Sequence, residues 1–127
     1  MSRKRTGLIA VCIWMIAAPI AQAYEANPLR TFATCAGRLS AVMEYQWMFD
    51  GAASEDTQRQ RAAVLDLVAA IMEPDQGRDV LQWRLQGKHA QSVLLTRATF
   101  NDDPADAAWA REQSAQMTRS CTGLLLS

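Results

Sequence analysis

Apolar residues recur at three- and four-residue steps between Asn27 and Asp50, and this spacing predicts an amphipathic helix. Asn27 is a suitable N-cap, and Pro28 suits the first helical position because the N–H that it lacks would be unpaired there. Gly51 is expected to end the helix. Its shared face predicts burial of six side chains: Phe32, Ala36, Leu39, Val42, Met43 and Gln46.

Three further helices are predicted by the same spacing and by the residues that interrupt it. Ser54 is the expected N-cap of the second helix, and Pro74 marks the break after it. The third is expected over about 75–99 and the fourth over about 104–125, with Asp103 as the N-cap of the fourth. No segment alternates polar and apolar residues convincingly, and β-branched residues are sparse. The chain is therefore predicted to be all-α.

The second and fourth helices have a predicted inner face, and the third has a set of apolar members. Gly87 falls within the third helix, where it either weakens the helix locally or allows a neighbouring helix to approach closely. The expected apolar residues are Val64, Leu65, Val68, Ile71 and Met72 in the second helix, Val80, Leu81, Trp83, Leu85, Ala90, Leu94, Leu95 and Ala98 in the third, and Ala105, Ala108, Trp109, Met117, Cys121, Leu124 and Leu125 in the fourth.

Four helices of about 20 residues joined by short loops favour an antiparallel up-down-up-down bundle. That topology brings Cys35, near the start of the first helix, to the same end as Cys121, near the end of the fourth. A long crossover would separate the two cysteines beyond the roughly 7 Å between Cα atoms that a disulfide tolerates. The prediction is a small antiparallel four-helix bundle closed by one Cys35–Cys121 disulfide. A reactive thiol is the alternative, because Arg38 and Arg119 are close in sequence to the two cysteines.

Residues 1–23 have the composition of a secretory signal peptide. Three basic residues precede an apolar run over 7–20, and Ala21-Gln22-Ala23 is a small-x-small cleavage site. An uncleaved anchor is the alternative, but the apolar run of about 14 residues is shorter than the roughly 20 that a spanning helix needs. We predict that 1–23 are removed and that 24–127 form one exported domain, periplasmic or secreted, without a stable membrane span.

Removal of the signal changes the net charge. The chain has thirteen basic and thirteen acidic residues, and three of the basic residues lie in the signal, so the mature domain carries a net charge of −3. Nucleic acid is an unsuitable partner, because its phosphates require a clustered basic surface. Cys12 leaves with the signal, and the remaining two cysteines in an oxidising compartment favour a disulfide over two free thiols.

The motifs of common enzyme and metal sites are missing from the sequence. His89 is the single histidine, and the chain contains no CxxCH, HExxH, GxSxG or glycine-rich phosphate loop. A copper(I) site at His89 with methionines is disfavoured, because no methionine pair has ligand-like spacing. The expectation is a non-enzymatic protein without a metal or another cofactor.

Two groups of residues are candidates for binding. Arg84 and Lys88 share a helical face, and with His89 they are candidate contacts for an anionic ligand. The alternative for Arg84 and Lys88 is a solvated face or pairing with Glu44 or Asp66. Tyr45, Trp47, Trp83 and Trp109 are more aromatic residues than a narrow core needs, and the predicted partner surface consists of Trp47, Phe49 and Trp83.

The predicted function is that of a secreted or periplasmic accessory domain that binds another envelope protein. The alternative is a carrier that holds an anionic or apolar small molecule between its helices through Arg84 and Lys88. A third interpretation is a bundle with a structural role alone.

Overall fold

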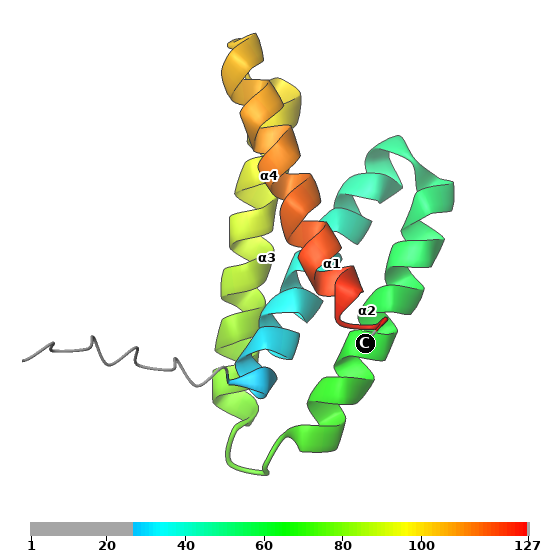
Figure 1. The fold of residues 1–127 in the computed structure, drawn as a ribbon, viewed down its shortest axis with the longest axis vertical. Coiled ribbons are helices and arrows are strands. Elements are labelled where there is room, and N and C mark those ends of the chain that lie inside the picture. The colour runs from blue at the N-terminus through cyan, green and yellow to red at the C-terminus, as the bar shows by residue number, and fades with distance from the viewer. Residues whose placement is uncertain (1–26, 127) are drawn as a thin grey trace, which may run out of the picture.

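The computed structural model describes residues 27–126, which form four α-helices whose consecutive members run in opposite directions (Figure 1). The helices are α1 (Pro28–Phe49), α2 (Gly51–Ile71), α3 (Gly77–Phe100) and α4 (Pro104–Gly123). The predicted all-α antiparallel bundle is thereby confirmed. The predicted signal peptide, residues 1–23, lies outside the described residues. No helix within 27–126 is long and apolar enough to cross a membrane.

Helix α1 is the centre of the fold. It packs against both α2 and α3, and the end of α4 crosses it, whereas α2 and α3 make little contact with each other (Figure 1). Because α1 has neighbours on several sides, its burial extends beyond the one predicted face. The buried residues of α1 are Leu29, Ala33, Cys35, Ala36, Gly37, Leu39, Ser40, Ala41, Val42 and Met43.

Two glycines allow α1 and α3 to cross at very short range. A Cβ on Gly37 would lie 1.9 Å from the carbonyl oxygen of Arg84, and a Cβ on Gly87 would lie 2.3 Å from that of Thr34. No side chain of any size fits between two backbones this close. Close helix approach at Gly87, one of the two predicted alternatives, is therefore confirmed.

The helix caps agree with the sequence at two of the three predicted positions. The Oδ1 of Asn27 accepts a hydrogen bond from the N–H of Arg30 at 3.1 Å, and Asp103 caps α4 in the same way. The prediction for α2 is wrong: the helix begins at Gly51, and its N-cap is Asp50. Ser54 lies inside the first turn, buried, and donates to the carbonyl of Gly51 at 2.6 Å. The single residue Asp50 separates the two helices and reverses the chain, so α2 begins at Gly51 directly after it.

The predicted inner faces of α2 and α4 are partly wrong, and several of the apolar residues of α3 are exposed. Leu81 and Leu85 are 53% and 57% exposed, because they lie on a side of α3 that no other helix covers. Ile71, Met72, Ala105, Ala108 and Trp109 are exposed as well. The buried residues are Val80, Gly87, Gln91 and Ala98 in α3 and Ala107, Ala110, Ser114 and Cys121 in α4, and three of them, Val80, Ala98 and Cys121, are in the predicted sets.

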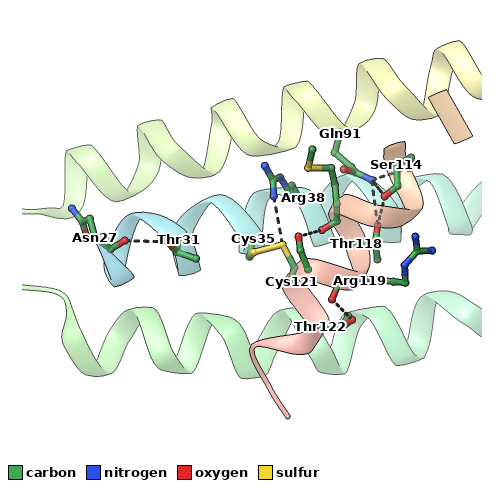
Figure 2. Close-up of a disulfide and its surroundings, with 12 residues drawn as sticks. Asn27, Thr31, Cys35, Arg38, Gln91, Ser114, Thr118, Arg119, Cys121 and Thr122 are labelled. Carbon is green, nitrogen blue, oxygen red and sulfur yellow. Dashed lines mark hydrogen bonds between the residues drawn. A yellow bond between two sulfur atoms is a disulfide. The ribbon is translucent and has the colours of Figure 1, made fainter. Parts of the chain in front are cut away.

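The predicted disulfide joins α1 to α4 (Figure 2). Cys35 and Cys121 are bonded, with their Cα atoms 5.3 Å apart, and both are buried in one apolar cluster with Leu39 and Val64. The Arg38 guanidinium lies 4.0 Å from the Cys121 sulfur, and burial lowers the pKa of this arginine. The cross-link closes the bundle and leaves no free thiol at the two positions.

A buried amide joins α3 to α4 beside the disulfide (Figure 2). The Nε2 of Gln91 donates to the hydroxyl of Ser114 at 2.9 Å and to that of Thr118 at 3.3 Å. These bonds satisfy the buried amide nitrogen of Gln91, whereas its Oε1 is buried without a hydrogen-bond partner among residues 27–126. Because the bonds join α3 to α4, they favour this register of the two helices.

Candidate functional site

Three cationic side chains from two helices surround a hollow above the middle of α1. Arg61 of α2 and Arg84 and Lys88 of α3 line it, and its volume is about 170 Å³. We call this site the basic groove. Its floor is formed by α1, and the complete lining is Gly37, Ser40, Met43, Glu44, Arg61, Leu81, Arg84, Leu85 and Lys88.

The glycine crossing positions the α3 side of the groove. The Cβ position of Gly37 is in contact range of the Arg84 carbonyl and, at 2.9 Å, of the Lys88 backbone nitrogen. The backbones that carry both cations are therefore pressed directly onto α1. This close contact fixes where the α3 side of the groove lies relative to α1.

Polar contacts hold two of the three cations. The Lys88 ammonium pairs with the Glu44 carboxylate at 2.6 Å, which is one of the two pairings weighed for it from the sequence. The Nε of Arg61 donates to the Ser40 hydroxyl at 2.6 Å, and that hydroxyl donates to the carbonyl of Ala36. Ser40 is therefore a fixed acceptor that orients the Arg61 guanidinium.

Arg84 is the cation without such a contact. It makes no ion pair and no side-chain hydrogen bond with any residue of 27–126, although it is only partly exposed. The groove thus contains three positive charges against the single negative charge of Glu44. This local excess stands out because residues 24–127 carry a net charge of −3, and like charges gathered at short range repel one another.

His89 is exposed on α3 and does not line the basic groove. Its neighbour Lys88 faces the groove, but one residue along a helix turns the side chain by about 100°. Within the described part of the chain, no three His, Cys, Asp or Glu side chains are grouped as a metal ion would require. The structure therefore brings together two of the three predicted ligand contacts.

The predicted partner residues lie in two separate places. Trp47 and Phe49 are 60% and 55% exposed in the last turn of α1, with Met48 between them at 69%. Trp83 is partly buried near the start of α1, where it packs on the apolar cluster that contains Ala33. From Ala33 to Trp47 the rise along α1 is about 21 Å. Trp83 therefore does not share a surface with the other two.

We call the three exposed residues Trp47, Met48 and Phe49 the α1 tip. The ring of Phe49 packs on Tyr45 with 4.6 Å between centroids, and the Tyr45 hydroxyl is hydrogen-bonded to Thr99 of α3 at 2.9 Å. These contacts hold the start of the last turn in place. The remaining surface of the tip is apolar and uncovered by residues 27–126.

Arg61 is the groove residue that sequence reasoning missed. It follows the buried Thr57 by four residues and precedes the buried Val64 by three, so its helical phase places it on the inner side of α2. From this phase the sequence could have shown that Arg61 faces inward. It could not show which side chains of α3 lie opposite, because residues 61 and 84 meet only through the packing of both helices on α1.

The fold and the groove define a class of protein, namely a small helical bundle whose first and last helices are cross-linked and whose central helix floors a cationic hollow. The chain matches no protein-family model, no curated protein and no solved structure.

Proposed function

We propose that this protein is an exported, non-enzymatic accessory protein that binds another protein of the cell envelope through the α1 tip. The observation that carries the proposal is the exposure of three consecutive large apolar side chains in one helical turn. Successive helical residues point about 100° apart, so exposure of all three spreads apolar surface over about half of the circumference of this turn. Exposed aromatic clusters of this kind are typical of protein contact sites.

The export and the absence of catalysis have separate support. The signal-like composition of 1–23 and the cross-link between the only two cysteines after it both favour an oxidising compartment. The sequence also lacks the motifs of the common hydrolases. A protease, nuclease or esterase activity of the mature protein that Arg84→Ala or His89→Ala abolished would contradict the non-enzymatic part of the proposal.

The test is a crosslinked pull-down from the native envelope with the mature domain as bait. The variant Trp47→Ser/Phe49→Ser removes the tip aromatics, and Val93→Ser is the matched control because Val93 is a half-exposed apolar residue of α3. We expect a defined envelope protein to be captured by the wild type and the control. Its dissociation constant for the tip variant should rise at least tenfold, equivalent to about 1.4 kcal/mol. Equal capture by both variants would exclude the α1 tip as the contact.

The second candidate function is a carrier of a small anionic ligand in the basic groove. It is favoured by the excess of positive charge around the hollow and by the lack of a partner for Arg84 among residues 27–126. Titration of the mature protein with inorganic phosphate and with butanoate tests it. We expect Arg84→Ala to weaken binding at least tenfold, while Arg78→Ala, on the exposed side of α3, leaves it unchanged. Loss of binding in both variants would show a non-specific charge effect instead.

A further inference from the structure

We propose that the basic groove binds a single-chain anionic amphiphile, such as a fatty-acid carboxylate. The charged head lies in the hollow between Arg61, Arg84 and Lys88, and the hydrocarbon chain lies along Leu81 and Leu85. This inference rests on the second candidate function and names the class of ligand that the groove takes.

The hollow matches a head group in size and in charge. A volume of about 170 Å³ is below the roughly 300 to 1,000 Å³ of sites that enclose a whole drug-sized ligand, so the hollow holds only a small group. A carboxylate has two oxygens that the fork of Arg84 can bind side by side. Binding there supplies one negative charge, which offsets half of the excess of Arg61, Arg84 and Lys88 over Glu44.

The apolar wall next to the hollow matches a chain. Leu81 and Leu85 are one turn apart on α3, about 6 Å along its axis, and both line the same groove as Arg84 and Lys88. Each is more than half exposed, and α2 is too far from α3 to cover them. A hydrocarbon chain that leaves the hollow along α3 would remove both side chains from water.

An amphiphile fits this lining better than an acidic peptide helix does. A helix docked in a groove buries a repeating set of apolar anchors over two or more turns. The groove offers two exposed leucines beside one small hollow. A ligand with one head and one chain uses both features and requires nothing further.

The test compares ligands of one head and increasing chain length. The mature protein is titrated by calorimetry with butanoate, octanoate and dodecanoate, each below its micelle concentration. We expect Kd to fall about two- to fourfold for each added methylene group that is buried. Dodecyltrimethylammonium, with the same chain and a positive head, should not bind, and a hexaglutamate peptide should bind no better than butanoate.

Matched variants separate the two parts of the site. Arg84→Gln is expected to raise Kd at least tenfold for every chain length, and Arg78→Gln is its control. Leu81→Ser/Leu85→Ser is expected to abolish the dependence on chain length and to leave butanoate binding unchanged, with Val93→Ser as its control. All five positions are at least partly exposed, so the variants are expected to fold, and circular dichroism verifies it.

The outcomes distinguish this inference from the proposals on which it rests. Equal affinity for butanoate and dodecanoate would overturn the amphiphile and leave a carrier of small anions. No binding of any anion would overturn both. Chain-length dependence that persists in the leucine variant would place the chain elsewhere and would also overturn the inference. Partner binding at the α1 tip is read separately, by the pull-down with the Trp47→Ser/Phe49→Ser variant.

Discussion

Gly37 and Gly87 determine how closely the two main helices pack and, through that contact, where the groove cations lie. Both positions face a backbone carbonyl of the opposite helix at a distance that excludes a Cβ. A flexible side chain can move away from an added methyl group, but a helix backbone moves only if the helices separate. The effect of a substitution here is therefore expected to extend to the whole α1–α3 interface.

We predict that Gly37→Ala destabilises the protein by at least about 2 to 3 kcal/mol, because the methyl group would overlap the Arg84 carbonyl. Gly77→Ala is the control: nothing lies within 4 Å of its Cβ position, and alanine there is expected to be neutral or to add up to about 1 kcal/mol. Urea denaturation of both variants measures the difference. A Gly37→Ala protein as stable as wild type would show that the two helices do not cross as described.

A second residue-scale feature is the ion pair between Arg97 at the end of α3 and Asp106 at the start of α4. The Arg97 Nε donates to the Asp106 carboxylate at 2.6 Å, and Asn101 also donates to it. The hydrogen bond from Arg97 lowers the pKa of Asp106, with a smaller contribution from Asn101. The Arg97 guanidinium also lies over the Trp109 ring, 4.9 Å from its centroid.

Because the pKa of Asp106 is lowered in the folded protein, the free energy of unfolding depends on pH. An unfolded aspartate titrates near pH 3.9, so below about pH 5 the unfolded state binds more protons than the folded state at this residue. The contribution of the ion pair to stability is complete above about pH 5, and it is lost as the pH falls through the pKa that Asp106 has in the folded protein. We predict that Asp106→Asn makes the free energy of unfolding less dependent on pH between about 5 and 2. Arg97→Gln should do the same, and unchanged slopes in both variants would refute the pairing.

At the scale of the helix, the link between α1 and α2 is a single residue. Asp50 ends one helix and caps the next, with its Oδ1 accepting from the N–H of Ala53 at 3.2 Å and its own N–H bonded to the Gln46 carbonyl. Its extended backbone turns the chain, so the two helices meet without a loop. The helices on either side depend on this residue because its side chain and its backbone each satisfy a terminal group.

We predict that Asp50→Ala lowers the free energy of unfolding by about 0.5 to 2 kcal/mol through loss of the N-cap of α2. Asp50→Asn retains a side-chain oxygen and is the control, expected to remain within about 0.5 kcal/mol of wild type. Thermal unfolding followed by circular dichroism measures both. Equal losses in the two variants would assign the role to the charge and not to the cap.

At the scale of the whole molecule, the disulfide closes a loop of 86 residues between the first and last helices. Helix α4 contacts α1 less extensively than α2 and α3 do, so the cross-link is the strongest tie between its end and the centre of the fold. The chain-entropy account assigns such a loop about 4 to 5 kcal/mol, a large share of the roughly 5 to 15 kcal/mol by which a domain is stable.

We predict that Cys35→Ala/Cys121→Ala lowers the free energy of unfolding by up to about 4 to 5 kcal/mol, because the unfolded chain regains the freedom that the loop removes. Wild-type protein treated with a reductant is the control and should match the double variant. Urea denaturation measures all three forms. A loss below about 1 kcal/mol would mean that α4 is held to α1 by packing alone.

The sequence alone was sufficient for the helix number, two of the three predicted caps and the Cys35–Cys121 pairing. Helical spacing and capping residues act over three or four positions, so they can be recognised in the amino-acid sequence. The cysteine pairing could be predicted because only two cysteines follow the predicted signal peptide and one topology brings them together. Arg84 and Lys88 were identified as a pair for the same reason, since they lie one turn apart.

Only the tertiary structure decided which apolar residues are covered and which charges meet. Leu81 and Leu85 have the hydrophobicity of core residues, but they lie at the open side of the basic groove, because the side of α3 that contacts α1 directly is the one that contains Gly87. Arg61 joins Arg84 and Lys88 because both outer helices pack on the same central helix. Local pattern determines which residues form helices, whereas the contacts between helices depend on the distance and rotation at which backbones cross, and those are settled by packing across the entire bundle.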